Sequence, residues 1–149
     1  MKTIRNVFVL LCLSPFVTAL AQPASDFIVV DEIADNIKQL QEEFEGQANV
    51  FYTDGNSFNA LEQISAELEG RQIANLHLYV PTKPGAIVFS SLSITSRDVD
   101  EVSEELKALG NYVSNSVVIH SESVFSGEEG LLLKQRLEEI SGIVFTVQN

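Results

Sequence analysis

Short apolar runs alternate with amphipathic helical patterns along this chain, and this alternation constrains its fold more than any other feature. The first run, Phe27–Val30, predicts a strand. It is followed by apolar residues four, three and four positions apart, from Ile33 to Phe44, which is the spacing of one helical face and predicts a helix. Further runs predict strands over residues 49–52, 74–80, 116–120 and 143–147, and further stripes predict helices over 58–68, 99–109 and 133–140. Apolar strands alternating with helices predict a mostly parallel sheet covered on both faces.

The predicted fold is therefore a three-layer α/β sandwich. Five principal strands with right-handed crossovers fit a doubly wound sheet with the flavodoxin-like order 2-1-3-4-5. Two short apolar runs, 86–89 and 92–94, predict a small β-hairpin after the third strand. Its consecutive apolar residues Ile87, Val88 and Phe89 leave two alternatives open: an edge that recruits another strand, or a hairpin folded over the domain's own core.

Helix boundaries are indicated by caps. A polar residue with an acid three positions later is the pattern of a capping box, and it occurs at Asn59, Thr95 and Ser126. The predicted helix ends are marked by Gly70, Gly110 and Gly142. No repeat or linker interrupts residues 22–149, so they are expected to form a single domain.

The first 21 residues have the three-part pattern of a secretory signal peptide. Lys2 and Arg5 precede an apolar run that extends to Leu20, and Ala19 and Ala21 form an A-x-A cleavage motif. The run is interrupted by a proline and is shorter than the roughly 20 residues that a membrane-spanning helix needs. We therefore expect cleavage after Ala21 and a periplasmic or secreted protein without membrane insertion.

Export changes both the charge and the available chemistry. The chain has 9 basic and 21 acidic residues, a net charge of -12, and losing residues 1–21 with two basic side chains brings the charge to -14. This charge disfavours nucleic acids and anionic membranes as partners. Cys12 is the only cysteine, and the bulky Leu11 before it does not fit a lipoprotein cleavage site. The mature domain thus has no disulfide, no thiolate ligand and no cysteine nucleophile, and we expect no cofactor.

Ligands of doubly wound sheets gather at the carboxyl ends of the strands, so four loops are candidate sites. These loops contain Asp31 and Glu32, Thr53 and Asp54, Pro81 to Lys83, and Ser121 to Ser123. The residue types in these loops decide which reactions the domain could support.

Three stretches of the chain resemble a known family. They read F-I-V-V-D over residues 27–31, L-H-L-Y-V-P-T-K-P-G over 76–85, and V-V-I-H-S-E-S-V-F-S-G-E-E-G over 117–130. They resemble the domain of unknown function at the front of giant bacterial repeat adhesins, which is similar to the caspase and gingipain clan of cysteine peptidases. The resemblance covers residues 27–148, and it implies a caspase-like fold and a role in adhesion or biofilm formation.

This chain departs from that family at both catalytic positions. The resemblance places the base histidine at the end of the third strand and the nucleophilic cysteine at the end of the fourth. Aligned from His77 to Gly85, the histidine position falls on Pro81, and aligned back from residues 127–130, the cysteine position falls on Glu122. Proline has no titratable group and a carboxylate is no substitute for a thiolate, so we predict no cysteine-type hydrolase activity and a pseudoenzyme.

Two histidines could still carry chemistry. His120, with Glu122 two residues along the same strand face, could act as a base with an orienting carboxylate, and Ser121 or Ser123 could supply a hydroxyl. This alternative is a small periplasmic hydrolase, although no G-x-S-x-G motif accompanies it. His77 lies in the middle of a strand, where we expect a buried histidine that is hydrogen-bonded to its neighbours.

A third alternative is a cation-binding accessory protein. Asp31, Asp54 and Glu122 could converge at the strand ends as an oxygen-rich calcium site, but the loop pattern of a dedicated calcium site is missing. A solvated acidic rim explains the same residues, so no metal ligands are assigned.

The sequence favours an exported, non-catalytic binding or interaction module whose partner is a protein of the periplasm or cell envelope. The candidate contact surface consists of Pro81, Thr82, Lys83, Glu122 and Ser123.

Overall fold

The computed structural model describes residues 25–56 and 58–149, and its main element is a five-stranded parallel sheet. The strands lie in the order β2-β1-β3-β7-β8, which is the predicted doubly wound order. Their bounds are Ser25–Asp31 (β1), Val50–Thr53 (β2), Ile73–Tyr79 (β3), Val113–His120 (β7) and Val144–Gln148 (β8). The predicted signal peptide lies outside the described residues.

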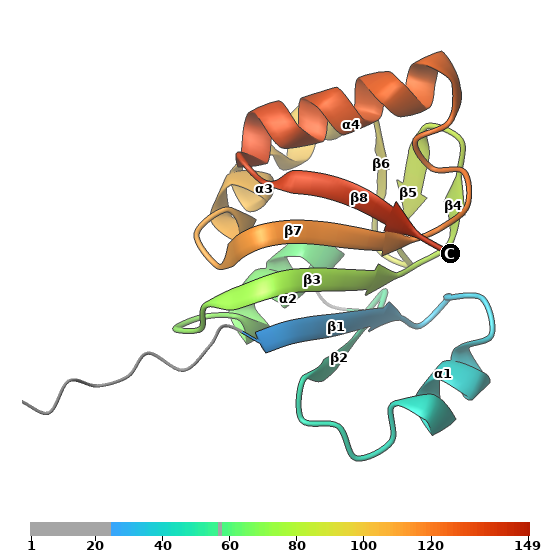
Figure 1. The fold of residues 1–149 in the computed structure, drawn as a ribbon, viewed down its shortest axis with the longest axis vertical. Coiled ribbons are helices and arrows are strands. Elements are labelled where there is room, and N and C mark those ends of the chain that lie inside the picture. The colour runs from blue at the N-terminus through green and yellow to red at the C-terminus, as the bar shows by residue number, and fades with distance from the viewer. Residues whose placement is uncertain (1–24, 57) are drawn as a thin grey trace, which may run out of the picture.

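Within the described residues, helices cover both faces of this sheet. They are α1 (Ile37–Glu43), α2 (Ala60–Glu67), the 3-10 helix η1 (Val99–Val102), α3 (Ser103–Leu109) and α4 (Gly127–Ser141). Helices α2, α3 and α4 lie together on one side of the strands, and α1 lies on the other side, near β1 and β2 (Figure 1). The predicted α/β sandwich is confirmed, with α1 as the helix of its thinner layer.

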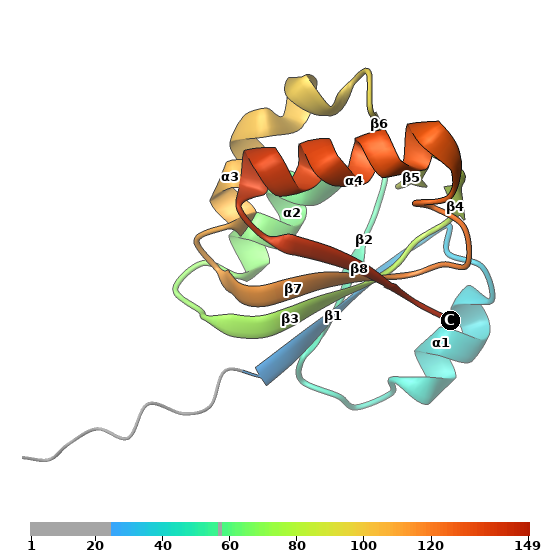
Figure 2. The ribbon, with the colours of Figure 1, turned by 45° about the horizontal axis from the view of Figure 1, so that its top comes forward.

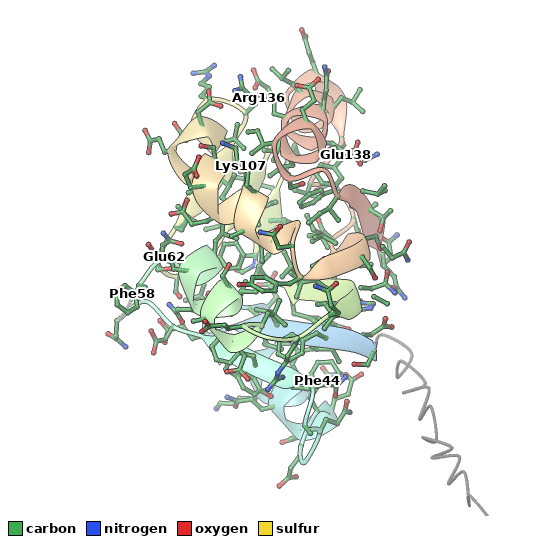
Figure 3. All side chains as sticks on the ribbon, turned by 90° about the vertical axis from the view of Figure 1, so that its left-hand side faces the viewer. Phe44, Phe58, Glu62, Lys107, Arg136 and Glu138 are labelled. Atoms are coloured by element: carbon green, nitrogen blue, oxygen red, sulfur yellow. The ribbon has the colours of Figure 1, made fainter. Side chains whose placement is uncertain are left out.

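Neighbouring residues of β1 belong to two separate hydrophobic cores. Val29 is buried in the larger core, beneath α2, α3 and α4, whereas Val30 packs with Phe44 and α1 in the smaller core. Successive residues of a strand point to opposite faces, so β1 buries both of its faces. Figure 3 shows Phe44 on the opposite side of the strands from Lys107 and Arg136, which lie on α3 and α4.

The predicted hairpin is part of a three-stranded antiparallel sheet made of β4 (Thr82–Lys83), β5 (Ala86–Val88) and β6 (Ser93–Thr95). Strands β5 and β6 are the predicted pair, and β4 adds a third strand. Ile87 is 2% exposed and Phe89 is 3% exposed. The hairpin therefore folds over the domain's own core, the second of the two alternatives.

One of the three predicted capping boxes is confirmed. The side chain of Asn59 accepts the backbone N–H of Glu62, and the Glu62 carboxylate accepts the backbone N–H of Asn59. The prediction at Thr95 is wrong, because Thr95 ends β6 and η1 precedes α3. Ser126 is the N-cap residue of α4, as predicted, but the capping box is absent: its side chain makes no cap bond, and the Glu129 carboxylate instead accepts a hydrogen bond from Ser96. A tertiary partner has replaced the local one.

Candidate functional site

A pocket of about 320 Å³ opens at the carboxyl ends of β3, β7 and β8, beside α1. We name it the strand-end pocket; its lining includes Asp35, Leu40, Tyr79, His120, Glu122 and Gln148. Figure 2 shows the carboxyl end of β8 next to α1. This is the edge of the sheet at which doubly wound folds bind their ligands.

His77 and His120 form a pair on the face of the sheet that α1 partly covers. Nδ1 of His77 lies 3.1 Å from Nε2 of His120, and the ring centres are 5.4 Å apart. The two nitrogens therefore lie close to the line between the ring centres, which is a hydrogen-bonding geometry. His120 also stacks on Tyr79, with ring centres 3.8 Å apart and planes inclined by 12°.

The carboxylate of Asp26, near the start of β1, lies on the other side of His77 from His120. Nε2 of His77 lies 3.5 Å from Oδ2 of Asp26, and the other oxygen of Asp26 accepts a hydrogen bond of 2.8 Å from Asn75. The negative charge of Asp26 favours the imidazole proton of His77 on the nearby Nε2. When both imidazoles are neutral, Nδ1 of His77 accepts the Nε2–H of His120. Nδ1 of His120 is then left as a hydrogen-bond acceptor.

The aromatic residues of the strand-end pocket are uncharged near neutral pH. Burial, together with the neighbouring His77, lowers the pKa of His120 to about 4. Burial raises the pKa of Tyr79, and the carboxylate of Glu43 adds to this increase. His120 therefore presents a neutral imidazole rather than a cation to anything that enters the pocket.

Asp31, a predicted site residue, is fully buried at the end of β1. Its Oδ2 accepts hydrogen bonds from the hydroxyls of Thr53, at 2.7 Å, and Ser90, at 3.0 Å. Its Oδ1 accepts the backbone N–H groups of Ser90, at 2.9 Å, and Ile33, at 3.2 Å. Asp31 thus joins β1 to β2 and to the loop between β5 and β6, and its carboxylate is fully engaged in structural bonds.

Ser121 is engaged in the same way at the end of β7. Its hydroxyl is hydrogen-bonded to the hydroxyl of Thr82 and accepts the backbone N–H groups of Ser123 and Val124, both at 3.2 Å. These bonds join β4 to the loop that follows β7. A serine nucleophile needs a base at its hydroxyl, and here Thr82 takes that position.

Two of the five predicted contact residues line hollows, and the two hollows are different. Glu122 is exposed and lines the strand-end pocket, whereas Lys83 lines a separate hollow between the small sheet and the start of α4. Thr82 is tied to Ser121, and the carbonyl of Pro81 accepts a backbone N–H from β5. The carbonyl of Ser123 accepts a backbone N–H from the residue that precedes α4.

The histidine pair is the feature that the sequence did not reveal. His77 is hydrogen-bonded, as predicted, but its side chain is 20% exposed and its partner is His120. Among the described residues, His120 bonds to His77 and not to Glu122, its expected partner. The sequence contained a signal for this pair: once β3 is placed beside β7, the alternation of side chains along each strand puts both histidines on one face of the sheet.

The expected calcium ligands are not gathered into a site. In the part of the chain that the structure describes, no three histidine, cysteine or carboxylate side chains are grouped to hold a metal ion. Asp31 is engaged by four donors, and the carboxylate of Asp54 accepts the backbone N–H of Asn56.

None of the helices over residues 25–56 and 58–149 is long and apolar enough to cross a membrane.

Comparison with known proteins gives one match. A family model described as "domain of unknown function (DUF4347)" matches residues 27–148. No curated protein and no solved structure matches the chain. The matched segment includes both histidines and nearly the whole five-stranded sheet. The chain therefore belongs to the DUF4347 family.

Proposed function

We propose that this chain is an exported, non-catalytic domain that binds a protein partner in the periplasm or outside the cell. The contact surface is the carboxyl edge of the sheet, with Glu122 in the strand-end pocket and Pro81, Thr82, Lys83 and Ser123 beside it. The observation that carries the proposal is that polar groups of this edge are engaged in structural hydrogen bonds rather than arranged for a reaction.

Two groups that could take part in a hydrolytic reaction at this edge, the hydroxyl of Ser121 and the carboxylate of Asp31, serve as structural ties. Ser121 is held by Thr82 and two backbone N–H groups, and Asp31 is enclosed by Thr53 and Ser90. The side chains that line the pocket are two exposed carboxylates, a neutral imidazole, carboxamides, a serine, a leucine and a tyrosine. This combination suits recognition by hydrogen bonds.

The setting of the proposed function comes from the sequence. Pro81 and Glu122 occupy the positions of base and nucleophile in the resembled peptidase clan, which supports a pseudoenzyme. The pattern of residues 1–21 supports export, and the resemblance to the leading domain of repeat adhesins supports adhesion or biofilm formation as the process. The net charge of -14 expected after cleavage favours a partner with a basic surface.

Site-specific photo-crosslinking in the native cell envelope tests the proposal. A crosslinking amino acid at position 122 should capture one discrete protein, and the same group at position 101, an exposed residue of η1, should not. Glu122→Lys should abolish the complex in a pull-down, while Glu101→Lys should leave it unchanged. Equal capture from both positions, or no capture, would contradict the proposal.

The histidine pair supports a second candidate, a small hydrolase in which His120 is the base. A screen of ester and peptide substrates with the purified protein separates the two candidates. Turnover that His120→Phe abolishes would establish the hydrolase and overturn the binding module.

A further inference from the structure

We infer that the strand-end pocket binds an organic cation that carries N–H donors, namely an ammonium or guanidinium group. The inference rests on the proposed function, because it names the chemical group that a partner would present to the domain. Two independent features carry it: the charge of the pocket lining and the orientation of His120.

The lining is negatively charged without a compensating cation. It contains the carboxylates of Asp35 and Glu122, both on exposed residues, and among the described lining residues there is no lysine or arginine. The rest of the lining is made of carboxamides, a serine, a leucine and the two aromatic rings. The potential in such a pocket attracts cations and repels anions.

His120 adds an uncharged acceptor to these carboxylates. The chain of contacts from Asp26 through His77 assigns the proton of His120 to Nε2, which leaves Nδ1 as an acceptor. Burial lowers the pKa of His120 to about 4, so the ring does not repel a cation near neutral pH. His77 and Asp26 therefore act as positioning residues: they fix which nitrogen of His120 is free to accept.

The size of the pocket suits the end of a side chain or a small amine. Its volume of about 320 Å³ is open on one side, so the remainder of a larger ligand can stay outside. Ammonium and guanidinium groups carry several N–H donors and no acceptor. They therefore match a lining that offers carboxylates and a neutral imidazole acceptor, which a neutral polyol or an anion cannot do with the same charge complementarity.

Nuclear magnetic resonance of the imidazole nitrogens tests this inference directly, because the chain has only 2 histidines. In the purified protein with ¹⁵N-labelled histidine, both rings should show the Nε2–H tautomer near neutral pH. Arginine amide and spermidine should then shift the Nδ1 signal of His120 saturably. Glutamate and glucose should not shift it at the same concentrations.

Matched variants separate the pocket from general surface charge. Glu122→Gln should weaken the arginine amide affinity about fivefold and His120→Phe about tenfold, the effect of losing one solvent-accessible hydrogen bond. Glu128→Gln, an exposed position outside the pocket lining, should leave the affinity unchanged. Shifts that are equal for glucose or glutamate, or unaffected by Glu122→Gln and His120→Phe, would overturn the inference.

The same titration, carried out with further ligands, distinguishes a protein side chain from a free amine as the source of the cation. A short peptide with one arginine should bind at least as well as arginine amide, and its glutamine counterpart should not bind, if the ligand is a side chain of a protein. Stronger binding of spermidine than of the arginine peptide would assign the pocket to free amines. If a partner crosslinks at position 122 but no cation shifts His120, the proposed function stands and this inference fails.

Discussion

Nδ1 of His77 lies 3.1 Å from Nε2 of His120, although the two residues are 43 positions apart in the chain. They come together because β3 and β7 are neighbours in the sheet, and both side chains point to the face that α1 covers only in part. Burial and this contact together lower the pKa of His120, which has consequences for stability as well as for binding.

The first prediction concerns the pH dependence of stability. The pKa of His120 is about 4 in the folded protein and returns to its ordinary value of 6.5 on unfolding. Between pH 6.5 and pH 4 the unfolded chain binds more protons, so the free energy of unfolding should fall as the pH is lowered through this window. Partial exposure of the ring reduces the effect to about 1–2 kcal/mol. Urea denaturation at a series of pH values measures it.

The control for this prediction is His120→Phe, which keeps an aromatic ring against Tyr79 and removes the titrating group. The carboxylates titrate in both proteins, so the difference between the two stability curves reports the titration of His120 together with any change that its loss causes at His77. That difference should change most between pH 6.5 and pH 4 and level off at lower pH, once His120 is protonated in the folded protein as well. A difference that stays flat through the window would show that burial does not perturb His120.

The second prediction concerns Asp31. Asp31→Ala leaves four hydrogen-bond donors without their acceptor in a fully buried position, and it should lower the free energy of unfolding by about 3–5 kcal/mol. Asp31→Asn keeps the shape and one acceptor oxygen and should cost about 1–2 kcal/mol. The exposed Asp35→Ala should stay within about 0.5 kcal/mol of the wild type. Similar losses for Asp31→Ala and Asp35→Ala in urea denaturation would refute the structural role of Asp31.

The third prediction separates a structural serine from a catalytic one. Ser121→Ala removes the tie between β4 and the loop after β7, and it should lower the free energy of unfolding by about 1–2 kcal/mol. Ser123→Ala removes a half-buried hydroxyl and should change it by less than about 0.5 kcal/mol. Thermal denaturation of both variants provides the measurement. If Ser123→Ala destabilised the domain more than Ser121→Ala, the structural role of the Ser121 hydroxyl would be refuted.

The fourth prediction concerns Gly130 in α4. A Cβ atom at this position would lie 2.5 Å from the carbonyl carbon of Phe125 and 2.8 Å from the carbonyl oxygen of Val124, both backbone atoms. Gly130→Ala should therefore destabilise the domain by about 2–3 kcal/mol, whereas glycine to alanine in an unobstructed helix stabilises. The control is Leu131→Ala, at a side chain that is 63% exposed, with an expected change below about 0.5 kcal/mol. Unchanged or increased stability of Gly130→Ala in urea would contradict the close approach.

Particular helix ends show what local sequence can and cannot predict. Gly70 and Gly142 follow α2 and α4 in the left-handed conformation, with φ of 75° and 72°, for which glycine is the usual residue. Gly110 ends α3 as predicted, but for a different reason: its φ is -58°, and a Cβ there would meet the carbonyl oxygen of Ser141 at the end of α4. A close approach between two helices leaves no trace in the local pattern.

The sequence by itself determined the principal strands and helices and the order of the five strands in the large sheet. Periodicity is a local property, and the right-handed crossover rule converts a series of strands and helices into a small number of topologies. The same reasoning located the carboxyl edge of the sheet and identified Asp31, Ser121 and Glu122 as residues of that edge.

Only the tertiary structure decided what those residues do. It brought Ser90 to Asp31, Thr82 to Ser121 and His77 to His120, pairs that lie 59, 39 and 43 positions apart. A hydrogen bond requires two groups within about 3 Å, and the distance between residues so far apart in sequence is set by strand register and packing rather than by any local pattern. The polar groups of the edge were therefore visible in the sequence, and their partners were not.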